Sequence, residues 1–305
     1  MFKKIIFLLF VVMLVIFRCS DNKNYNTYLI FKGDSSHMPV WYSTDEFIIF
    51  LYNYDVASIN PDGQNFNILL SGAEKINSVS DDGYIIFDTS SDVNSKDMYY
   101  FKPGSDPVKF PFKGFCASVY GNLSGKYNIV YLYDDNEETL GWSIYIADIN
   151  GSTPKKIIGE GYFYDPAWSP DGRKIVYTKY NNWSSKNAGT SYSPDDTSNY
   201  NICIYNLEIE SMSILYTYDE ISCPRFSPDG NYITFAAPSE NQNISQNVVW
   251  LIKTSGGDPW QVTEYPYEPG RDTHGVYYLS WSPDGKWIVY DMGTEGELWK
   301  VHVFK

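Results

Sequence analysis

The sequence predicts an all-β protein, a six-bladed β-propeller whose blades are four-stranded antiparallel sheets. The phrase WSPDGRKIVY at 168–177 returns almost unchanged as WSPDGKWIVY at 281–290. Weaker copies extend the series to six units, in which serines lie 37 to 58 residues apart, close to the about 40–50 residues of propeller repeats. An alternating strand that ends in a polar turn follows each copy, as in IYIADINGS at 144–152. The six serines are Ser43, Ser80, Ser124, Ser169, Ser227 and Ser282.

Each copy of the phrase predicts a tight hairpin between the first two strands of a blade, here named A and B. Residues 169–172 spell Ser-Pro-Asp-Gly, which suits a type I turn because proline presets φ and glycine accepts the left-handed region. The run Ile-Val-Tyr at 175–177 has the β-branched and aromatic character of a strand. The alternating run then forms strand C, and a short fourth run forms strand D, so each unit supplies one four-stranded blade.

The two ends of the chain predict how the ring closes. The last unit has strand A at about 277–281, strand B at 286–291 and strand C at 297–304, after which the sequence stops. The run TYLIF at about 27–31 belongs to no unit of its own. We therefore expect the N-terminal strand to pair with the C-terminal strand at about 297–304, because this pairing closes the ring and covers an exposed edge.

The phrase W-S-P-D-G-K-x-I-V-Y, followed by an "IY" strand and an "NG" turn, resembles the WD40-like TolB-type propeller repeat. This repeat occurs in the C-terminal domain of TolB and in propellers attached to some serine peptidases. The resemblance covers about residues 27–304 and implies the same six-bladed propeller. Two parts of those relatives have no counterpart here, namely the N-terminal α/β domain of TolB and the G-x-S-x-G elbow of an α/β-hydrolase. The sialidase Asp-box, S-x-D-x-G-x-T-W, is not matched either.

The first residues predict export from the cytoplasm. Lys3 and Lys4 precede an apolar run from Ile5 to Phe17, which is shorter than a membrane-spanning helix. With Cys19 as the lipidated residue, this start resembles a bacterial lipoprotein signal, although Arg18 departs from the small residue usual before that cysteine. We expect a signal peptide at 1–18, a tether at 19–26 and the propeller at 27–305. Ordinary secretion and an uncleaved tether remain alternatives, and all three place the domain outside the cytoplasm, facing the periplasm or the cell surface.

The composition indicates which kinds of partner and cofactor the protein is expected to bind. The formal net charge is −14 and no basic stripe interrupts it, so the surface repels nucleic acid and anionic lipid headgroups. The 28 tyrosines suit packing between radially stacked sheets, and we expect most of them in the core. Cys116, Cys203 and Cys223 are expected as small buried hydrophobic residues. The sequence contains no C-x-x-C or His/Cys metal spacing, and we expect no cofactor.

Propeller geometry divides the polar residues between two faces. The A–B turns lie on one face, where Asp171, Asp229 and Asp284 are expected to form turns rather than to act chemically. The D–A and B–C connections lie on the other face and include the long polar segment 179–200 and the tyrosine-rich segment 265–278. Long loops on a rigid scaffold commonly carry function. We therefore predict a binding rim on this second face, formed by His37, Tyr133, Asp134, Tyr162, Tyr164, Asp165, Trp183, Tyr267, Glu268, Arg271, Asp272 and His274.

The favoured function is a non-catalytic binding or scaffold module, monomeric and lipid-anchored, for a protein, a peptide or a glycan at the cell envelope. The alternative is a carbohydrate-active propeller, lyase-like or glycan-binding, in which His37 and His274 act as metal ligands or as acid and base. That alternative predicts that His37, His274 and Arg271 converge in a deep pocket. A purely structural role in an envelope complex is the third possibility, since fold alone does not settle function.

Overall fold

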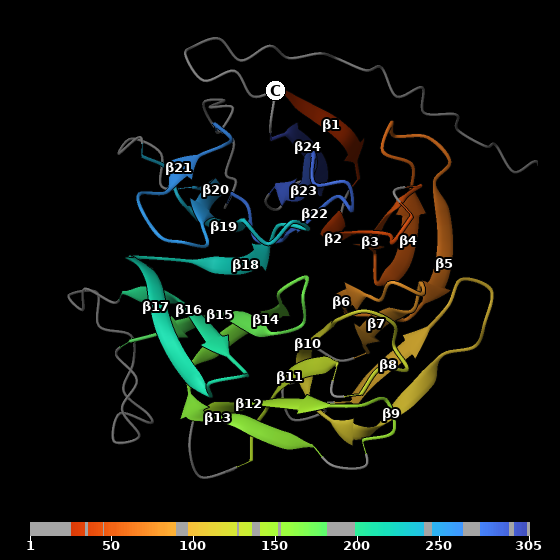
Figure 1. Ribbon diagram of the computed structural model, residues 1–305. Coiled ribbons are helices and arrows are strands. Elements are labelled where there is room, and N and C mark those ends of the chain that lie inside the picture. The colour runs from red at the N-terminus through yellow and green to blue at the C-terminus, as the bar shows by residue number, and fades with distance from the viewer. Residues whose placement is uncertain are drawn as a thin grey trace, which may run out of the picture.

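The chain folds into a ring of six four-stranded antiparallel sheets (Figure 1), which confirms the predicted fold class. Within each sheet, the strands follow one another outward from the axis, and no helix interrupts them in the described part of the chain. The computed structural model describes residues 26–33, 36–44, 46–89, 97–126, 128–135, 141–151, 154–181, 199–240, 246–264, 275–292 and 296–303.

The first three blades are built from consecutive strands. Blade 1 comprises β2 (Ser36–Trp41), β3 (Ile48–Tyr52), β4 (Asp55–Ile59) and β5 (Asn67–Ser71). Blade 2 comprises β6 (Lys75–Val79), β7 (Ile85–Asp88), β8 (Asp97–Phe101) and β9 (Val108–Lys113). Blade 3 comprises β10 (Phe115–Val119), β11 (Ile129–Tyr133), β12 (Trp142–Ala147) and β13 (Lys155–Gly161).

Blades 4 and 5 repeat this order, and blade 6 is completed by the N-terminal strand. Blade 4 comprises β14 (Phe163–Trp168), β15 (Lys174–Tyr180), β16 (Tyr200–Asn206) and β17 (Ser211–Tyr218). Blade 5 comprises β18 (Ser222–Phe226), β19 (Tyr232–Pro238), β20 (Asn247–Lys253) and β21 (Trp260–Gln261). Blade 6 comprises β22 (Leu279–Trp281), β23 (Trp287–Met292), β24 (Glu297–His302) and β1 (Thr27–Lys32).

Ring closure follows the predicted pairing. Strand β1 lies antiparallel to β24, with Thr27 opposite Val301 and Lys32 opposite Glu297. Ile30, in the middle of β1, is 1% exposed and packs into a core cluster that continues into blade 1. The N-terminal strand thus covers the outer edge of blade 6 and fastens the first blade to the last.

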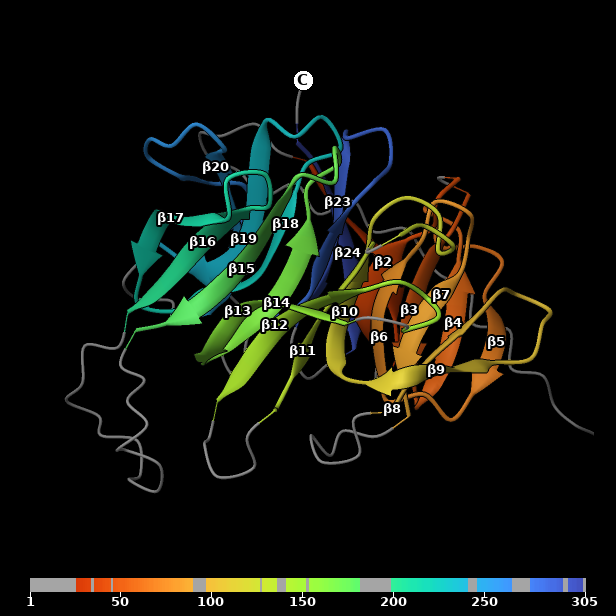
Figure 2. The same cartoon turned by 60° about the horizontal axis from the view of Figure 1, so that its bottom comes forward.

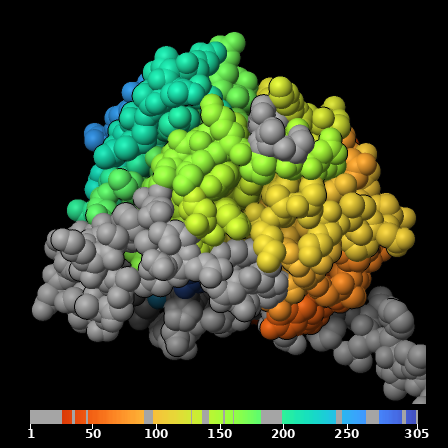
Figure 3. Space-filling view, turned by 90° about the horizontal axis from the view of Figure 1, so that it is seen from below, coloured from red at the N-terminus to blue at the C-terminus, as the bar shows by residue number. Residues whose placement is uncertain are grey.

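The core lies between neighbouring blades and is formed by aliphatic and aromatic side chains from facing sheets. Figure 2 shows the ring of blades from an oblique angle, and in the side view of Figure 3 blades 2, 3 and 4 pack side by side (yellow to teal). Most of the described tyrosines lie in or pack against these core clusters, as the sequence predicts, although few of them are themselves fully buried. The buried tyrosines among the described residues are Tyr131, Tyr177, Tyr205 and Tyr290.

The repeated turn holds itself together through a buried serine. In blade 4 the Ser169 hydroxyl donates to Asp171 Oδ1 at 2.6 Å and accepts the Lys174 N–H at 2.9 Å. Blades 2, 5 and 6 repeat both hydrogen bonds, with serines that are at most 2% exposed. The carboxyl pKa of each turn aspartate is lowered, since hydrogen bonds to the carboxylate outweigh the opposing effect of burial. These aspartates form turns, as the sequence predicts.

Two of the six predicted serines do not occupy this position. In blade 1 the N–H that bonds back across the hairpin belongs to Tyr42, one residue before Ser43. In blade 3 it belongs to Tyr120, which bonds to Asn128 across a longer turn that contains Ser124. The hydroxyl of tyrosine lies at the far end of its ring, so it cannot close the turn as the serine hydroxyl does. These two hairpins therefore differ from the others in length and hydrogen bonding.

Candidate functional site

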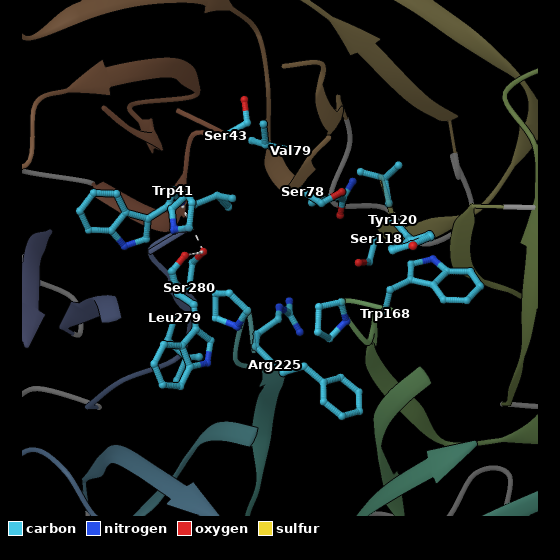
Figure 4. Close-up of a pocket in the computed structure, with 18 of the residues that line it drawn as sticks. Trp41, Ser43, Ser78, Val79, Ser118, Tyr120, Trp168, Arg225, Leu279 and Ser280 are labelled. Atoms are coloured by element: carbon cyan, nitrogen blue, oxygen red, sulfur yellow. Dashed lines mark hydrogen bonds between the residues drawn. The ribbon is translucent and has the colours of Figure 1, made fainter. Parts of the chain in front are cut away.

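A cavity of about 400 Å³ opens at the centre of the ring, on the face that carries the A–B turns. Residues from all six inner strands line it, together with the turns that follow them (Figure 4). Tyr120 is 37% exposed at this mouth, and three prolines of the turns are also exposed there. These are Pro170, Pro228 and Pro283. The mouth thus offers flat and rigid contact surface, with the carboxylates of the turn aspartates on the same face.

The walls of the cavity are built from equivalent positions of the six blades. The last residue of each of the six inner strands pairs with an isoleucine of the second strand, which fixes the register. These terminal positions are Trp41, Val79, Val119, Trp168, Phe226 and Trp281. The three indoles are 6 to 9% exposed because they wedge between blades, so they shape the wall more than they offer contact area.

One residue earlier on each inner strand, the side chains surround the axis itself. Five of these six positions hold a small or short side chain, and the sixth holds an arginine. These positions are Val40, Ser78, Ser118, Ala167, Arg225 and Ser280, and all of them except the core residue Ala167 line the cavity. Figure 4 shows Arg225 reaching from β18 into the space that the smaller side chains leave open. Asp81 and Arg225 are the only charged side chains among the described residues that line the cavity.

Main-chain oxygens hold the Arg225 guanidinium in place. Its Nη1 donates to the carbonyl of Asp165 at 3.2 Å and to the carbonyl of Pro224 at 2.9 Å. The carboxylate of Asp165 accepts the Cys223 N–H instead, at 3.2 Å. Arg225 makes no ion pair with any residue that the structure describes. Its positive charge therefore faces the cavity with no carboxylate of the described ranges in contact with it.

Below this ring, the inner strands carry β-bulges at matching positions. The register shifts at each of them, and the residue two before the ring position has a positive φ in four blades. The four residues are Met38 (57°), Cys116 (51°), Asp165 (49°) and Cys223 (52°). Non-glycine residues seldom adopt this conformation, and bulges often lie beside functional sites, where they re-aim side chains. Here the bulges turn Asp165 and Cys116 toward the axis.

Lys75 crosses the channel beneath the cavity. Its ammonium donates to the Cys116 thiol, with Nζ and Sγ 2.9 Å apart, and lies 5.9 Å from the centre of the Tyr278 ring. Burial lowers the pKa of Lys75, but Cys116, Tyr278 and Asp165 around it outweigh burial and raise that pKa. The ammonium thus stays charged and connects blades 2, 3 and 6 across the axis.

Asp291 fastens blade 6 to blade 1 beside the same channel. It is 1% exposed and accepts the N–H groups of Tyr277, Tyr278 and Met38 at 2.9 to 3.4 Å. Burial raises the pKa of Asp291, while these N–H groups and the charge of His37 work against that rise. His37, on β2, therefore lies close to a buried carboxylate, as a polar residue of the predicted rim.

Only some residues of the predicted binding rim lie in the part of the chain that the structure describes. Tyr162 and Tyr164 join Trp142, Tyr180 and Tyr200 in a cluster of edge-on and tilted rings, with centroids 5.0 to 6.3 Å apart. This half-buried aromatic platform lies at the ends of blades 3 and 4 away from the A–B turns. The remaining described residues are scattered: Tyr133 ends β11 and Asp134 follows it, while Asp165 lies in the channel wall. Cys19, Trp183, Tyr267, Glu268, Arg271, Asp272 and His274 lie outside the described residues.

Sequence reasoning missed both the cavity and Arg225. The A–B turns were expected to have only a structural role, and the binding rim was expected on the long loops of the other face. The available signal was the inner-strand segment CPRFSPDG at 223–230, where an arginine stands at a position that faces the axis. Only the register of all six blades shows that the corresponding residues elsewhere are small.

Among the described residues, no group of three or more His, Cys, Asp and Glu side chains is arranged to hold a metal ion. In the same part of the chain, no helix has the length and apolar character needed to cross a membrane.

Comparison with known proteins supports the fold more strongly than any activity. No family model matches the chain. It is 31% identical over 136 residues to the uncharacterized peptidase YuxL of Bacillus subtilis, a match to 44% of this chain and 18% of that protein. It is 24% identical over 191 residues to the uncharacterized protein Atu1656 of Agrobacterium fabrum, covering 62% of this chain and 55% of that protein. The chain thus spans about a fifth of the first relative and about half of the second.

Solved structures confirm the TolB-like propeller. TolB from Acinetobacter baumannii superposes with a TM-score of 0.57 at 15% identity, over 88% of this chain and 63% of that chain. The gluconolactonase XC5397 of Xanthomonas campestris gives a TM-score of 0.62 at 11% identity, over 92% and 90%. An oligogalacturonate lyase of Vibrio parahaemolyticus gives 0.53 at 11% identity, over 92% and 97%. At such identities the likeness concerns the fold alone.

Proposed function

We propose that this chain is an extracytoplasmic binding module that holds a protein or peptide partner at the mouth of its central cavity. The observation that carries the proposal is the cavity itself, whose walls come from all six blades and whose mouth is formed by Tyr120 and three exposed prolines. Binding sites are concave and mostly apolar, with a few placed polar groups. This cavity is concave and holds placed polar groups, a guanidinium and several serines, although it is more polar than most such sites.

The rigidity of the ring also favours binding. The inner strands are fastened to one another by Lys75 and Asp291, so little conformational entropy is lost when a partner docks. A peptide with an extended or polyproline-like backbone suits a mouth built from proline and tyrosine, which provide contact area without flexible side chains. We place the domain at the cell envelope, tethered through lipidated Cys19, on the strength of the N-terminal pattern and the TolB-like fold.

A pull-down from envelope extract, with the full chain as bait, tests the proposal. Ser118→Phe places a ring in the cavity from a half-buried position, and Tyr180→Ala removes one ring of the platform on the opposite face. We expect the Phe variant to lose a partner that the Ala variant retains, with both variants showing the circular dichroism of the unchanged chain. Loss only in the Ala variant would instead place binding on the predicted rim. A bait that retains no protein would contradict the proposed function.

A carbohydrate-active role is the second candidate, because propellers with sugar-related activities share this fold. His37, the described member of the predicted histidine pair, lies near the buried Asp291 rather than in the cavity lining. Incubation with oligogalacturonate and with gluconolactone, followed by chromatography of the products, tests this candidate directly. Turnover that is lost in His37→Ala would establish it.

A further inference from the structure

We propose that the central cavity selects peptide segments that carry one carboxylate, which docks on Arg225. The inference rests on the proposed function and names the chemistry of the ligand. It follows from one asymmetry: at six equivalent positions around the axis, Arg225 is the single charged side chain.

The hydrogen bonds of Arg225 leave one edge of its guanidinium available. Nη1 is engaged by two carbonyl oxygens, at 2.9 and 3.2 Å. A guanidinium has five N–H donors in a planar fork, and its Nε and Nη2 donors bond to no residue that the structure describes. These two donors lie parallel on one edge. Two parallel N–H groups match the two oxygens of a carboxylate, which is the arrangement of a bidentate ion pair. The carbonyl contacts fix the plane of the fork before any ligand arrives.

The surroundings favour a carboxylate over other groups. The guanidinium is half-buried in a cavity whose lining is otherwise uncharged except for Asp81 near the mouth, so its field is less screened than that of a surface arginine. Ser78 and Ser118 hold hydroxyl groups at the same level of the ring, within the space shown in Figure 4.

The charge of the whole chain limits how acidic the ligand can be. A net charge of −14 repels polyanions at distances up to the Debye length, about 10 Å at 0.1 M salt. A single carboxylate within an uncharged segment avoids most of this repulsion and still gains the contact with Arg225. The preferred ligand is therefore a segment with one acid, supplied either by a Glu or Asp side chain or by a C-terminal carboxyl group.

Three pools of short random peptides, built from uncharged residues, test the proposal on the full chain. The first pool has one fixed glutamate and blocked ends, the second has glutamine in its place, and the third has glutamine and a free C-terminal carboxylate. We expect the immobilised protein to enrich the first or the third pool over the second, which also identifies the source of the carboxylate. Dissociation constants of enriched peptides are then measured by calorimetry.

Matched arginine variants assign the effect to the cavity. Arg225→Gln is expected to weaken binding roughly 10- to 100-fold, as for loss of hydrogen bonds to a charged group. Arg225→Lys is expected to recover part of the affinity, because it keeps the charge and loses the fork. Arg173→Gln is the control: Arg173 is an exposed arginine of the adjacent blade's turn, paired with Glu208 and outside the cavity lining. It is expected to bind as the unchanged chain does. Thermal melting curves verify that each variant is folded.

Each other outcome has a distinct meaning. Equal enrichment of the glutamate and glutamine pools, with no effect of Arg225→Gln, would overturn the carboxylate inference and leave peptide binding intact. Enrichment of no pool would overturn the inference together with the proposed peptide function. Binding of oligogalacturonate, with no peptide enriched, would show that a sugar acid is the ligand and would likewise overturn the inference.

Discussion

Replacing Ser282 with alanine should destabilise the protein by about 2 kcal/mol, because this serine closes the turn between β22 and β23 from inside the fold. Ser282 is 1% exposed; its hydroxyl donates to Asp284 Oδ1 at 2.7 Å and accepts the Trp287 N–H at 2.9 Å. The exposed Asp284 carboxylate can turn to water when the hydroxyl is removed. The Trp287 N–H cannot, and a buried donor without a partner costs about 1–3 kcal/mol.

The matched control is Ser105→Ala, in the turn between β8 and β9. Its hydroxyl also makes two hydrogen bonds, accepting the Lys102 N–H at 3.0 Å and donating to the Lys102 carbonyl at 2.9 Å, but it is exposed. Water replaces both bonds, so we expect a change within about 0.5 kcal/mol.

Urea unfolding followed by tryptophan fluorescence measures both variants. The unfolding midpoint should fall for Ser282→Ala at an unchanged m-value, and Tm should fall by about 4 °C. Equal losses in the two variants would refute the argument, since burial would then make no difference to the same pair of hydrogen bonds. A Ser282→Ala variant as stable as the unchanged chain would refute it as well.

Three further predictions concern the core and the channel. Ile30→Ala should cost about 2–5 kcal/mol in urea unfolding because Ile30 is 1% exposed, whereas Ile209→Ala, at a side chain 70% exposed, should change little; equal effects would argue against the closing strand. Burial raises the pKa of Asp88 to about 7, although the Lys75 charge and a hydrogen bond from Asn77 oppose this rise. The folded state therefore keeps a proton that the unfolded state loses, and the free energy of unfolding falls as pH rises from about 4 to about 7. Asp88→Asn should flatten this dependence in unfolding curves across the same range, and an unchanged slope would contradict the assignment. Cys203 and Cys223 are at most 1% exposed, and burial raises the pKa of each to about 11, so neither should react with Ellman's reagent at pH 8 until the chain unfolds; rapid reaction in the native state would disprove their burial.

The hairpins could be predicted because each turn is specified by a few adjacent residues. Ring closure could be predicted by counting the strands in the last repeat. A Ser-Pro-Asp-Gly turn specifies its own geometry within four residues, and a final blade without a fourth strand requires the leftover strand at the other end. Blades 1 and 3 show where this reasoning weakens. Their serines lie near the turn but not in it, and only the hydrogen bonds of Tyr42 and Tyr120 reveal the true alignment.

The channel wall could not be predicted, because a bulge is one extra residue that leaves the hydrophobic pattern almost unchanged. A partial signal does exist in the inner strands. Pro39, Pro166 and Pro224 each follow a bulged residue directly, and proline within a sheet is confined to edges and bulges. Cys116 has the same conformation without a following proline, so the signal identifies three of the four bulged residues that have a positive φ.

The position of Arg225 also shows why a search for function that considers only long loops misses a binding site in the central channel. Six equivalent inner strands place equivalent residues around one axis, so a long side chain on any blade reaches the space bounded by all the others. Four small residues that line the cavity and one arginine therefore create a pocket and its charge together, although no single blade contains either. Val40, Ser78, Ser118, Ala167 and Ser280 look unremarkable in their own strands. Their small size matters only because of Arg225, which lies on a sixth strand and is more than a hundred residues away in sequence from Val40, Ser78 and Ser118.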